Sequence, residues 1–113
     1  MNMTKEAKQP KTFIELQNDI IEAMRTIFDP EIPVDIYELG LIYEIKVDPG
    51  NNAHIVMTLT SPMCPVAESL PVEVKEKAMA LEGINDVEVE LTFDPTWDQN
   101  MMSEAAQLEL GLL

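Results

Sequence analysis

Residues 41–59, LIYEIKVDPGNNAHIVMTL, decide the fold because two alternating runs flank a cluster of turn formers. Residues 48–52, DPGNN, favour a reversal of the chain. Alternation places every second side chain on the same face of a strand, so each run is typical of a strand with one buried face. We therefore predict a β-hairpin. Its apolar positions are Leu41, Tyr43, Ile45 and Val47 in the first strand and Ile55, Met57 and Leu59 in the second.

The cleanest alternation in the chain, residues 87–93 (VEVELTF), predicts a third strand. Between it and the hairpin, residues 65–81 carry apolar side chains at helical spacing. Gly83 favours a left-handed turn after this helix. Pro71 lacks an amide donor, so it predicts either a kink or a second helical segment that starts near Pro71.

A first helix is predicted over residues 13–27. Thr12 and Glu15 match a capping box, and apolar residues then recur at helical spacing. Pro30 and Pro33 stop this helix and leave an irregular segment rich in carboxylates, which we call the acidic loop (residues 29–35).

A short last helix is predicted to begin after Ser103 and to end near Gly111, so the element order is α-β-β-α-β-α. This order predicts the α+β class: a small three-stranded mixed sheet with helices packed on one face, the other face being polar or covered by a partner. Residues 1–11 are predicted to be a disordered N-terminal tail, and residues 12–113 a single domain.

The composition excludes several classes of partner. The 113 residues include 21 acidic and seven basic side chains, a formal charge of −14, which repels nucleic acid and anionic membranes. Alternatively, the excess of acidic residues only increases the solubility of the protein. The single cysteine forms no internal disulfide, and we find neither a leader pattern nor an apolar stretch of the roughly 20 residues that span a bilayer. We therefore expect a soluble, cytoplasmic protein.

Cys64 lies in residues 60–65, TSPMCP, between the end of the second predicted strand and the start of a predicted helix. The positive end of a helix dipole favours the thiolate, the form of cysteine that attacks or binds metal. Alternatively, Cys64 is a small buried hydrophobic residue. The only histidine, His54, is expected roughly 20 Å away along the strand. This separation argues against a catalytic Cys–His pair, so we do not expect an enzyme.

One thiol cannot hold a permanent zinc ion or iron–sulfur cluster, which take several Cys or His ligands. An open set of ligands could instead receive and release iron or a cluster, with Asp29 and Glu31 adding oxygen ligands or orienting the thiol. Alternatively, the acidic loop is simply solvated. Two subunits sharing a cluster would supply two thiols, which favours a homodimer.

Three segments together resemble a known family: DPEIPVDIYELGLIYEI (residues 29–45), MTLTSPMCP (residues 57–65) and VEVELTFDPTWD (residues 87–98). They are similar to the SufT-like proteins of the iron–sulfur cluster assembly (SUF) system. That family is related to a eukaryotic cytosolic iron–sulfur targeting factor and to PaaD-type subunits of phenylacetyl-CoA oxygenase pathways. The resemblance covers roughly residues 13–103.

The resemblance implies an α+β domain that assists the maturation of iron–sulfur proteins, with the assembly machinery and client proteins as partners. It places the family's acidic pair on Asp29 and Glu31, its hydroxyl pair on Thr60 and Ser61, and its reactive cysteine on Cys64, all around one cleft. Ser61 stands where relatives often carry a second threonine. The PaaD-type branch has more cysteines toward its C-terminus, so the single cysteine here favours the assembly-factor branch.

Two functions follow as hypotheses. In the first, the protein is an assembly or maturation factor that delivers or inserts clusters through Cys64, with iron or a cluster held transiently and none bound permanently. In the second, it is a metal-free adaptor that docks onto a maturation or oxygenase complex through the acidic loop and Trp97. Trp97 is otherwise expected to cover the core.

Overall fold

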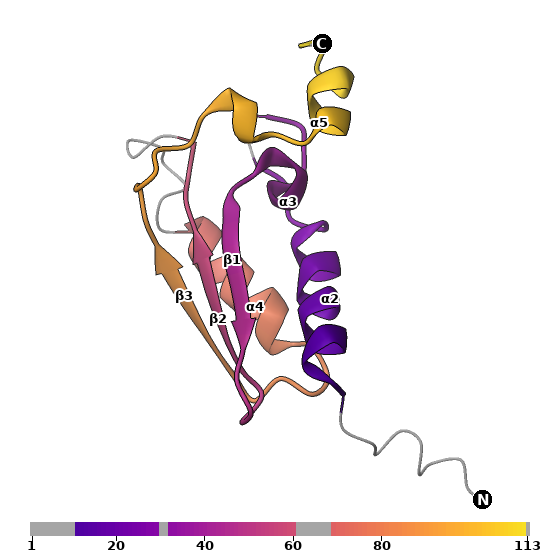
Figure 1. The fold of residues 1–113 in the computed structure, drawn as a ribbon, viewed down its shortest axis with the longest axis vertical. Helices are drawn as coiled ribbons and strands as arrows, with labels where there is room; N and C mark the ends of the chain where they lie inside the picture. The colour runs from indigo at the N-terminus through magenta and orange to yellow at the C-terminus, as the bar shows by residue number, and fades with distance from the viewer. Residues whose placement is uncertain (1–10, 30–31, 61–68, 113) are drawn as a thin grey trace, which may run out of the picture.

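The computed structural model describes residues 11–29, 32–60 and 69–112 and shows an α+β fold, as predicted (Figure 1). The predicted tail lies outside the described residues except for Lys11, whose ammonium group pairs with Asp19 at 2.7 Å. No helix in the described ranges is both long and apolar enough to cross a membrane. The elements in chain order are α2 (Phe13–Met24), α3 (Ile36–Leu39), β1 (Ile42–Val47), β2 (Asn52–Met57), α4 (Ser69–Met79), β3 (Asp86–Leu91), the 3-10 helix η2 (Gln99–Met101) and α5 (Glu104–Glu109).

The three strands form a mixed sheet of order β1-β2-β3, which confirms the predicted topology. β1 and β2 pair antiparallel through the predicted hairpin, whereas β2 and β3 pair parallel. Helix α2 packs on β1, α4 packs on β3, and the two helices contact each other, so both cover the same face (Figure 1). Helices α3 and α5 lie together beyond one end of this sheet (Figure 1).

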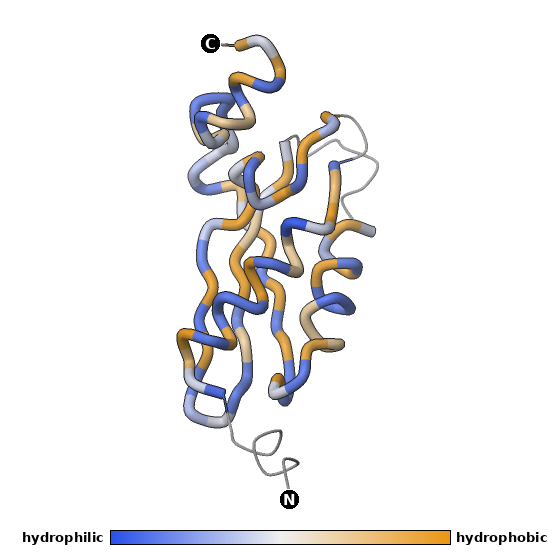
Figure 2. The backbone as a smooth tube through the Cα atoms, turned by 90° about the vertical axis from the view of Figure 1, so that its right-hand side faces the viewer, coloured by the Kyte–Doolittle hydropathy of each residue, from blue (hydrophilic) through white to orange (hydrophobic). Residues whose placement is uncertain are grey.

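The other face of the sheet is polar, as the alternation predicted. The register aligns Lys46, His54 and Glu88 across the three strands, and their neighbours Ile45, Ile55 and Val89 align on the covered face. Figure 2 shows the resulting alternation of hydrophilic and hydrophobic residues along the strands. The buried core therefore lies in one layer between the sheet and the helices. It includes Leu16, Ile20, Met24, Ile36, Leu39, Leu41, Ala53, Ile55, Met57, Leu70, Val74, Ala78 and Val87.

The predicted alternation of the first strand is wrong at Tyr43. The register shifts between Ile42 and Glu44, so that Ile42 pairs with Met57 and packs against the core while Tyr43 is the additional residue of a bulge. A bulge adds one residue to one strand, so the side chains on its two sides no longer follow a single strict alternation. The Tyr43 hydroxyl donates a hydrogen bond to the Pro95 carbonyl at 2.7 Å, which gives the displaced side chain a partner.

Helix α2 begins as predicted and ends earlier than predicted. The Thr12 amide donates to Glu15 Oε1 at 2.8 Å, and the Glu15 amide donates to Thr12 Oγ1 at 3.1 Å, which confirms the capping box. The helix stops at Met24 rather than at residue 27 because the last turn tightens. There the Ile27 amide bonds to the Met24 carbonyl, three residues back.

The second long helix, α4, is Ser69–Met79, and the first part of the range predicted for it lies outside the described residues. Pro71 occupies its first turn, where a missing amide removes no intrahelical hydrogen bond, so the prediction of a helical segment near Pro71 is confirmed. Gly83 is in the predicted left-handed conformation, with φ 96°. Helix α5 begins after Ser103, also as predicted.

Candidate functional site

The acidic loop holds Asp29 in a defined position. Asp29 is only 5% exposed, and its Oδ2 accepts a hydrogen bond from the Ile32 amide at 2.9 Å. The Asp29 amide donates a hydrogen bond to the Val34 carbonyl at 3.4 Å, and Phe28 forms a β-bridge with Asp35. A buried carboxylate that accepts a backbone hydrogen bond is fixed in orientation rather than free to sample solvent.

A short helix that the sequence analysis missed anchors the end of this loop. Asp35 Oδ2 accepts hydrogen bonds from the amides of Tyr37 and Glu38 at 3.1 and 3.0 Å and so caps α3. Gly40 ends α3 in the left-handed conformation. The predicted loop thus passes directly into one turn of helix before β1.

Backbone hydrogen bonds connect the residues on either side of the acidic loop to the end of β2. The Ile36 amide donates to the Ile27 carbonyl at 2.8 Å, and the Leu41 amide donates to the Ile36 carbonyl at 3.0 Å. The Thr58 amide in turn donates to the Leu41 carbonyl at 2.8 Å. Asp29 and Thr60 therefore lie at the same end of the domain, and the cleft expected around the five residues stays a prediction.

Two of the five predicted site residues fall in the described chain. Asp29 is buried and Thr60 is half-buried. Glu31, Ser61 and Cys64 lie outside the described residues, so the assignment of the thiol and its immediate neighbours stays a prediction. In the parts of the chain that the structure describes, no group of three His, Cys, Asp or Glu side chains is arranged to hold a metal ion.

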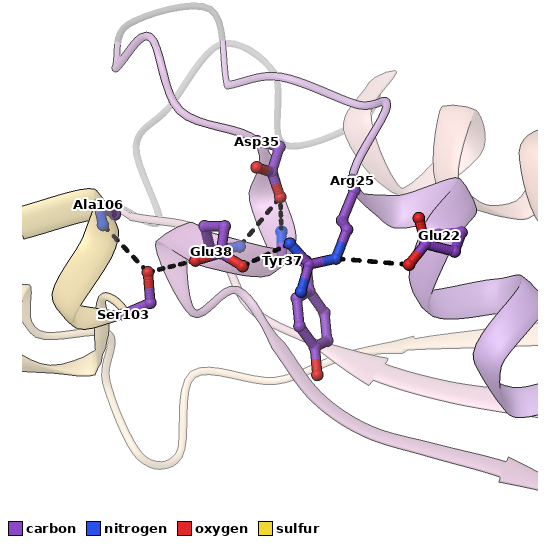
Figure 3. Close-up of polar contacts among 7 residues, drawn as sticks. All are labelled: Glu22, Arg25, Asp35, Tyr37, Glu38, Ser103 and Ala106. Atoms are coloured by element: carbon purple, nitrogen blue, oxygen red, sulfur yellow. Dashed lines mark hydrogen bonds and ion pairs between the residues drawn. The ribbon is translucent and has the colours of Figure 1, made fainter. Parts of the chain in front are cut away.

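A polar network on the outer side of the acidic loop ties three helices together (Figure 3). Arg25, directly after α2, pairs with Glu38 of α3 at 2.6 Å and with Glu22 at 3.8 Å. Glu38 also accepts a hydrogen bond from the Ser103 hydroxyl, and the Ser103 oxygen accepts one from the Ala106 amide at 3.1 Å and so caps α5. We call Arg25, Glu38 and Ser103 the helix network.

The helix network has no signature in the sequence because its members lie far apart in the chain. Arg25 and Glu38 are 13 positions apart, and Glu38 and Ser103 are 65 apart. Only the capping role of Ser103 has a local signature. The Arg25 guanidinium also lies 4.9 Å from the centre of the Tyr37 ring, a cation–π contact that no local pattern marks.

A shallow groove of about 360 Å³ lies between the acidic loop and α5. Phe28, which immediately precedes Asp29, lines this groove and is 58% exposed. Among the described residues that line the groove, Asp35, Glu38 and Glu109 contribute carboxylates and Arg25 contributes a cation. An exposed aromatic ring among carboxylates is a surface that a protein partner could contact.

The side chains of Trp97 and His54 both form contacts within the fold. The Trp97 indole donates a hydrogen bond to the Leu39 carbonyl at 2.9 Å, and its half-buried ring packs against the core, in agreement with the expected cover over the core. His54 lies on the open face of the sheet with its Nε2 3.0 Å from Glu90 Oε1.

The sequence matches a family model described as iron–sulfur cluster assembly protein over residues 17–91. It is 45% identical over 101 residues to an "Fe-S protein maturation auxiliary factor" of Porphyromonas gingivalis, covering 89% of this chain and 96% of the relative. It is 37% identical over 86 residues to the "Fe-S protein maturation auxiliary factor SufT" of Staphylococcus aureus, covering 76% of this chain and 98% of the relative.

The fold is also similar to a solved structure. A crystal structure of a "Domain of Unknown Function DUF59" from Bacillus anthracis superposes with a TM-score of 0.82 at 34% identity, covering 89% of this chain and 96% of the other. The match therefore extends from the sequence to the arrangement of helices and strands. The chain belongs to the iron–sulfur cluster assembly protein family.

Proposed function

We propose that this chain assists the maturation of iron–sulfur proteins by receiving iron or a cluster at Cys64 and passing it to a client protein. The observation that carries the proposal is family membership, since the similar proteins of P. gingivalis and S. aureus bear the name of maturation auxiliary factors. The cluster is cargo that the protein binds transiently, with none held permanently. The proposed role is delivery rather than catalysis.

The residues have separate parts in this proposal. The Cys64 thiolate contacts the iron, the cluster or a client cysteine, because the thiolate is the form of cysteine that binds metal. Thr60 and Ser61 donate hydrogen bonds to the sulfur or to its cargo. Asp29 and Glu31 shape the mouth of the site. The fixed, buried Asp29 carboxylate at the end of the domain that carries Thr60 supports this arrangement.

A homodimer belongs to the same proposal. A single thiol per chain is short of the ligands that a cluster takes, and two copies would supply two thiols. The remaining ligands would come from the assembly machinery or from the client. A cluster held in this way is released to a client more easily than a cluster held by four cysteines of one chain.

Anaerobic reconstitution of the full chain with iron and sulfide tests the role of the thiol. We expect visible absorption and bound iron for the wild-type protein, little of either for Cys64→Ser, and loss of client maturation in the same variant. The control variant is Asp98→Asn, which should bind iron as the wild type does. Asp98 caps the short helix η2, and asparagine also serves as a helix cap. Equal iron binding and equal client maturation by wild type and Cys64→Ser would exclude the mechanism.

The exposed Phe28 ring favours a second candidate, a metal-free adaptor that docks through the acidic loop. Partner capture would then be insensitive to Cys64→Ser and lost in the double variant Asp29→Asn with Glu31→Gln. Phe28→Ser would weaken capture without affecting iron binding. The covered position of Trp97 leaves the acidic loop, rather than the indole, as the contact of this adaptor.

A further inference from the structure

β3 has one edge without a neighbouring strand in the described sheet. The Thr92 amide donates to the Met57 carbonyl at 2.9 Å. The backbone N–H and C=O groups of the even-numbered residues of β3 therefore face β2. Backbone groups alternate along a strand, and those of Val87, Val89 and Leu91 therefore face the open edge. The Val87 amide donates a hydrogen bond to Asp86 Oδ1 at 2.9 Å. Val89 and Leu91 present the backbone groups that a further strand would need.

A groove of about 480 Å³ runs beside this edge, between β3 and α4. Val87 and Val89 line it from the strand, together with Asp86 and Glu88, and Pro71, Val72 and Lys75 line it from the helix. Val72 is an apolar residue that is 54% exposed. The groove thus continues the layer between sheet and helices past the last strand. Apolar side chains of an added strand would extend into it.

The open face of β3 carries only carboxylates. Asp86, Glu88 and Glu90 are all exposed on this face, and β3 contains no basic residue. Side chains directly opposite one another on neighbouring strands stabilise a sheet when their charges are opposite and destabilise it when they are alike. A strand added beside β3 would therefore place basic side chains on the open face. A second copy of β3 would instead bring its own carboxylates against these.

We propose that the edge of β3 binds an extended segment of a partner protein as a fourth strand, in which basic and apolar residues alternate. The apolar side chains occupy the groove beside Val72, and the basic side chains pair with Glu88 and Glu90. Backbone hydrogen bonds to Val89 and Leu91 supply affinity, as in other cases of strand addition. Binding at this edge is independent of the proposed maturation role.

The same carboxylates have an alternative explanation, in which they only protect an edge strand from unwanted pairing. The two explanations differ in their response to a matching strand. A protective edge rejects every strand, whereas a docking edge accepts a basic one. A synthetic peptide of alternating lysine and valine, as long as β3, separates them.

We expect this peptide to bind the full-length chain and to shift the NMR amide signals of β3 and of Val72. A glutamate–valine peptide of equal length should not bind. Affinity is expected to fall about tenfold in the double variant Glu88→Lys with Glu90→Lys. The double variant Glu44→Lys with Glu104→Lys, which changes the net charge equally on β1 and α5, should bind as the wild type does.

Two N-methylated forms of the peptide test the backbone contacts on the wild-type chain. Only alternate amides of an added strand point at β3, so methylation of the lysine amides and of the valine amides should differ in effect. Loss of binding on valine methylation indicates an antiparallel strand, and loss on lysine methylation a parallel one. Equal binding of both forms, absence of binding by the unmethylated peptide, or a dimer of this chain paired through β3 would overturn the proposal.

Discussion

Gly40 is a residue at which two separate parts of the chain approach each other closely. It ends α3 with φ 87°, in the left-handed region where side chains with a Cβ are strained. A Cβ placed there would lie 2.4 Å from the Met101 carbonyl oxygen. Both the conformation and the close contact require glycine.

Gly40→Ala is expected to lower the free energy of unfolding by about 2 kcal/mol or more, because it adds a backbone clash to the strain of the left-handed conformation. Urea titration followed by circular dichroism measures this change. Gly111→Ala is the control, since Gly111 also has a positive φ, 76°, and a methyl group added there would meet nothing within 4 Å. Equal losses in the two variants would contradict a role for the Met101 contact.

Asp48 makes the hairpin sensitive to acid. Hydrogen bonds from the backbone and side chain of Asn52, and from the Gly50 amide, lower the pKa of the Asp48 carboxyl below its ordinary value of 3.8. A lowered folded-state pKa contributes stability that is present above the unfolded-state value and is lost as the pH falls through the folded-state value. The wild-type protein should therefore lose more stability below about pH 4 than Asp48→Asn does. Melting temperatures of both proteins, measured from about pH 2 to pH 7, would contradict this if the two curves ran parallel.

Single residues with local partners are predictable from sequence, and those with distant partners are not. The capping box of Thr12 and Glu15 spans three positions, and Gly83 acts on its own backbone. The Tyr43 hydroxyl at the bulge donates instead to the Pro95 carbonyl, 52 positions away. No short window of sequence contains that contact, so strict alternation was the natural and wrong prediction there.

At the scale of elements, the short helices at the end of the sheet depend on one another. Helix α3 has four residues and α5 has six, lengths that are not stable alone in water. Ser103 connects them: its amide donates to the Glu38 carbonyl at 2.8 Å, and its hydroxyl caps α5 and reaches the Glu38 carboxylate. The acidic loop that carries Asp29 leads into α3, so this packing also fixes the candidate site.

Ser103→Ala is expected to cost about 2 kcal/mol of unfolding free energy, since it removes a helix cap and a hydrogen bond to a carboxylate. Thr96→Ala is the control, because the Thr96 hydroxyl donates to the carbonyl of Phe93, three positions away, at 3.2 Å. Chemical denaturation gives both values. A double-mutant cycle with Glu38→Gln should show that the losses at positions 103 and 38 are not additive; additive losses would count against the connection between α3 and α5.

The long elements were predictable because their periodicity extends over many residues, whereas α3 was not. The prolines at positions 30 and 33 and the carboxylates around them suggested a continuous loop, and only the Asp35 cap and Gly40 mark the single helical turn within it. The acidic pair and the hydroxyl pair of the candidate site come from the family resemblance and stay a prediction. The helix network was not predictable, since its charges are joined only by the tertiary fold.

For the whole molecule, the mixed sheet separates a buried face from a polar one with neighbouring residues on opposite sides. Ile55 is fully buried on the covered face of the central strand, and the next residue, Val56, lies half-buried on the open face between Glu44 and Glu90. Among the residues of β2, only the odd-numbered ones are buried in the single core layer.

Ile55→Ala should lower the unfolding free energy by about 2–5 kcal/mol, as expected for a cavity in a close-packed core. Val56→Ala should cost less than about 1 kcal/mol, because its side chain is partly solvated already. Guanidinium titrations of the two variants compare adjacent positions in one strand. Losses of similar size would mean that the open face is covered in solution, by a second copy or by another part of the chain.

The parallel pairing of β2 and β3 has a consequence for the order of folding. The hairpin closes over residues 48–51, but β3 can join only after residues 58–85 have crossed from one end of the sheet to the other with α4 in their path. Closing the longer connection costs more chain entropy before any native contact compensates for it. We therefore expect β3 to assemble last and to open first, so that its amide protons exchange with deuterated solvent sooner than those of β2.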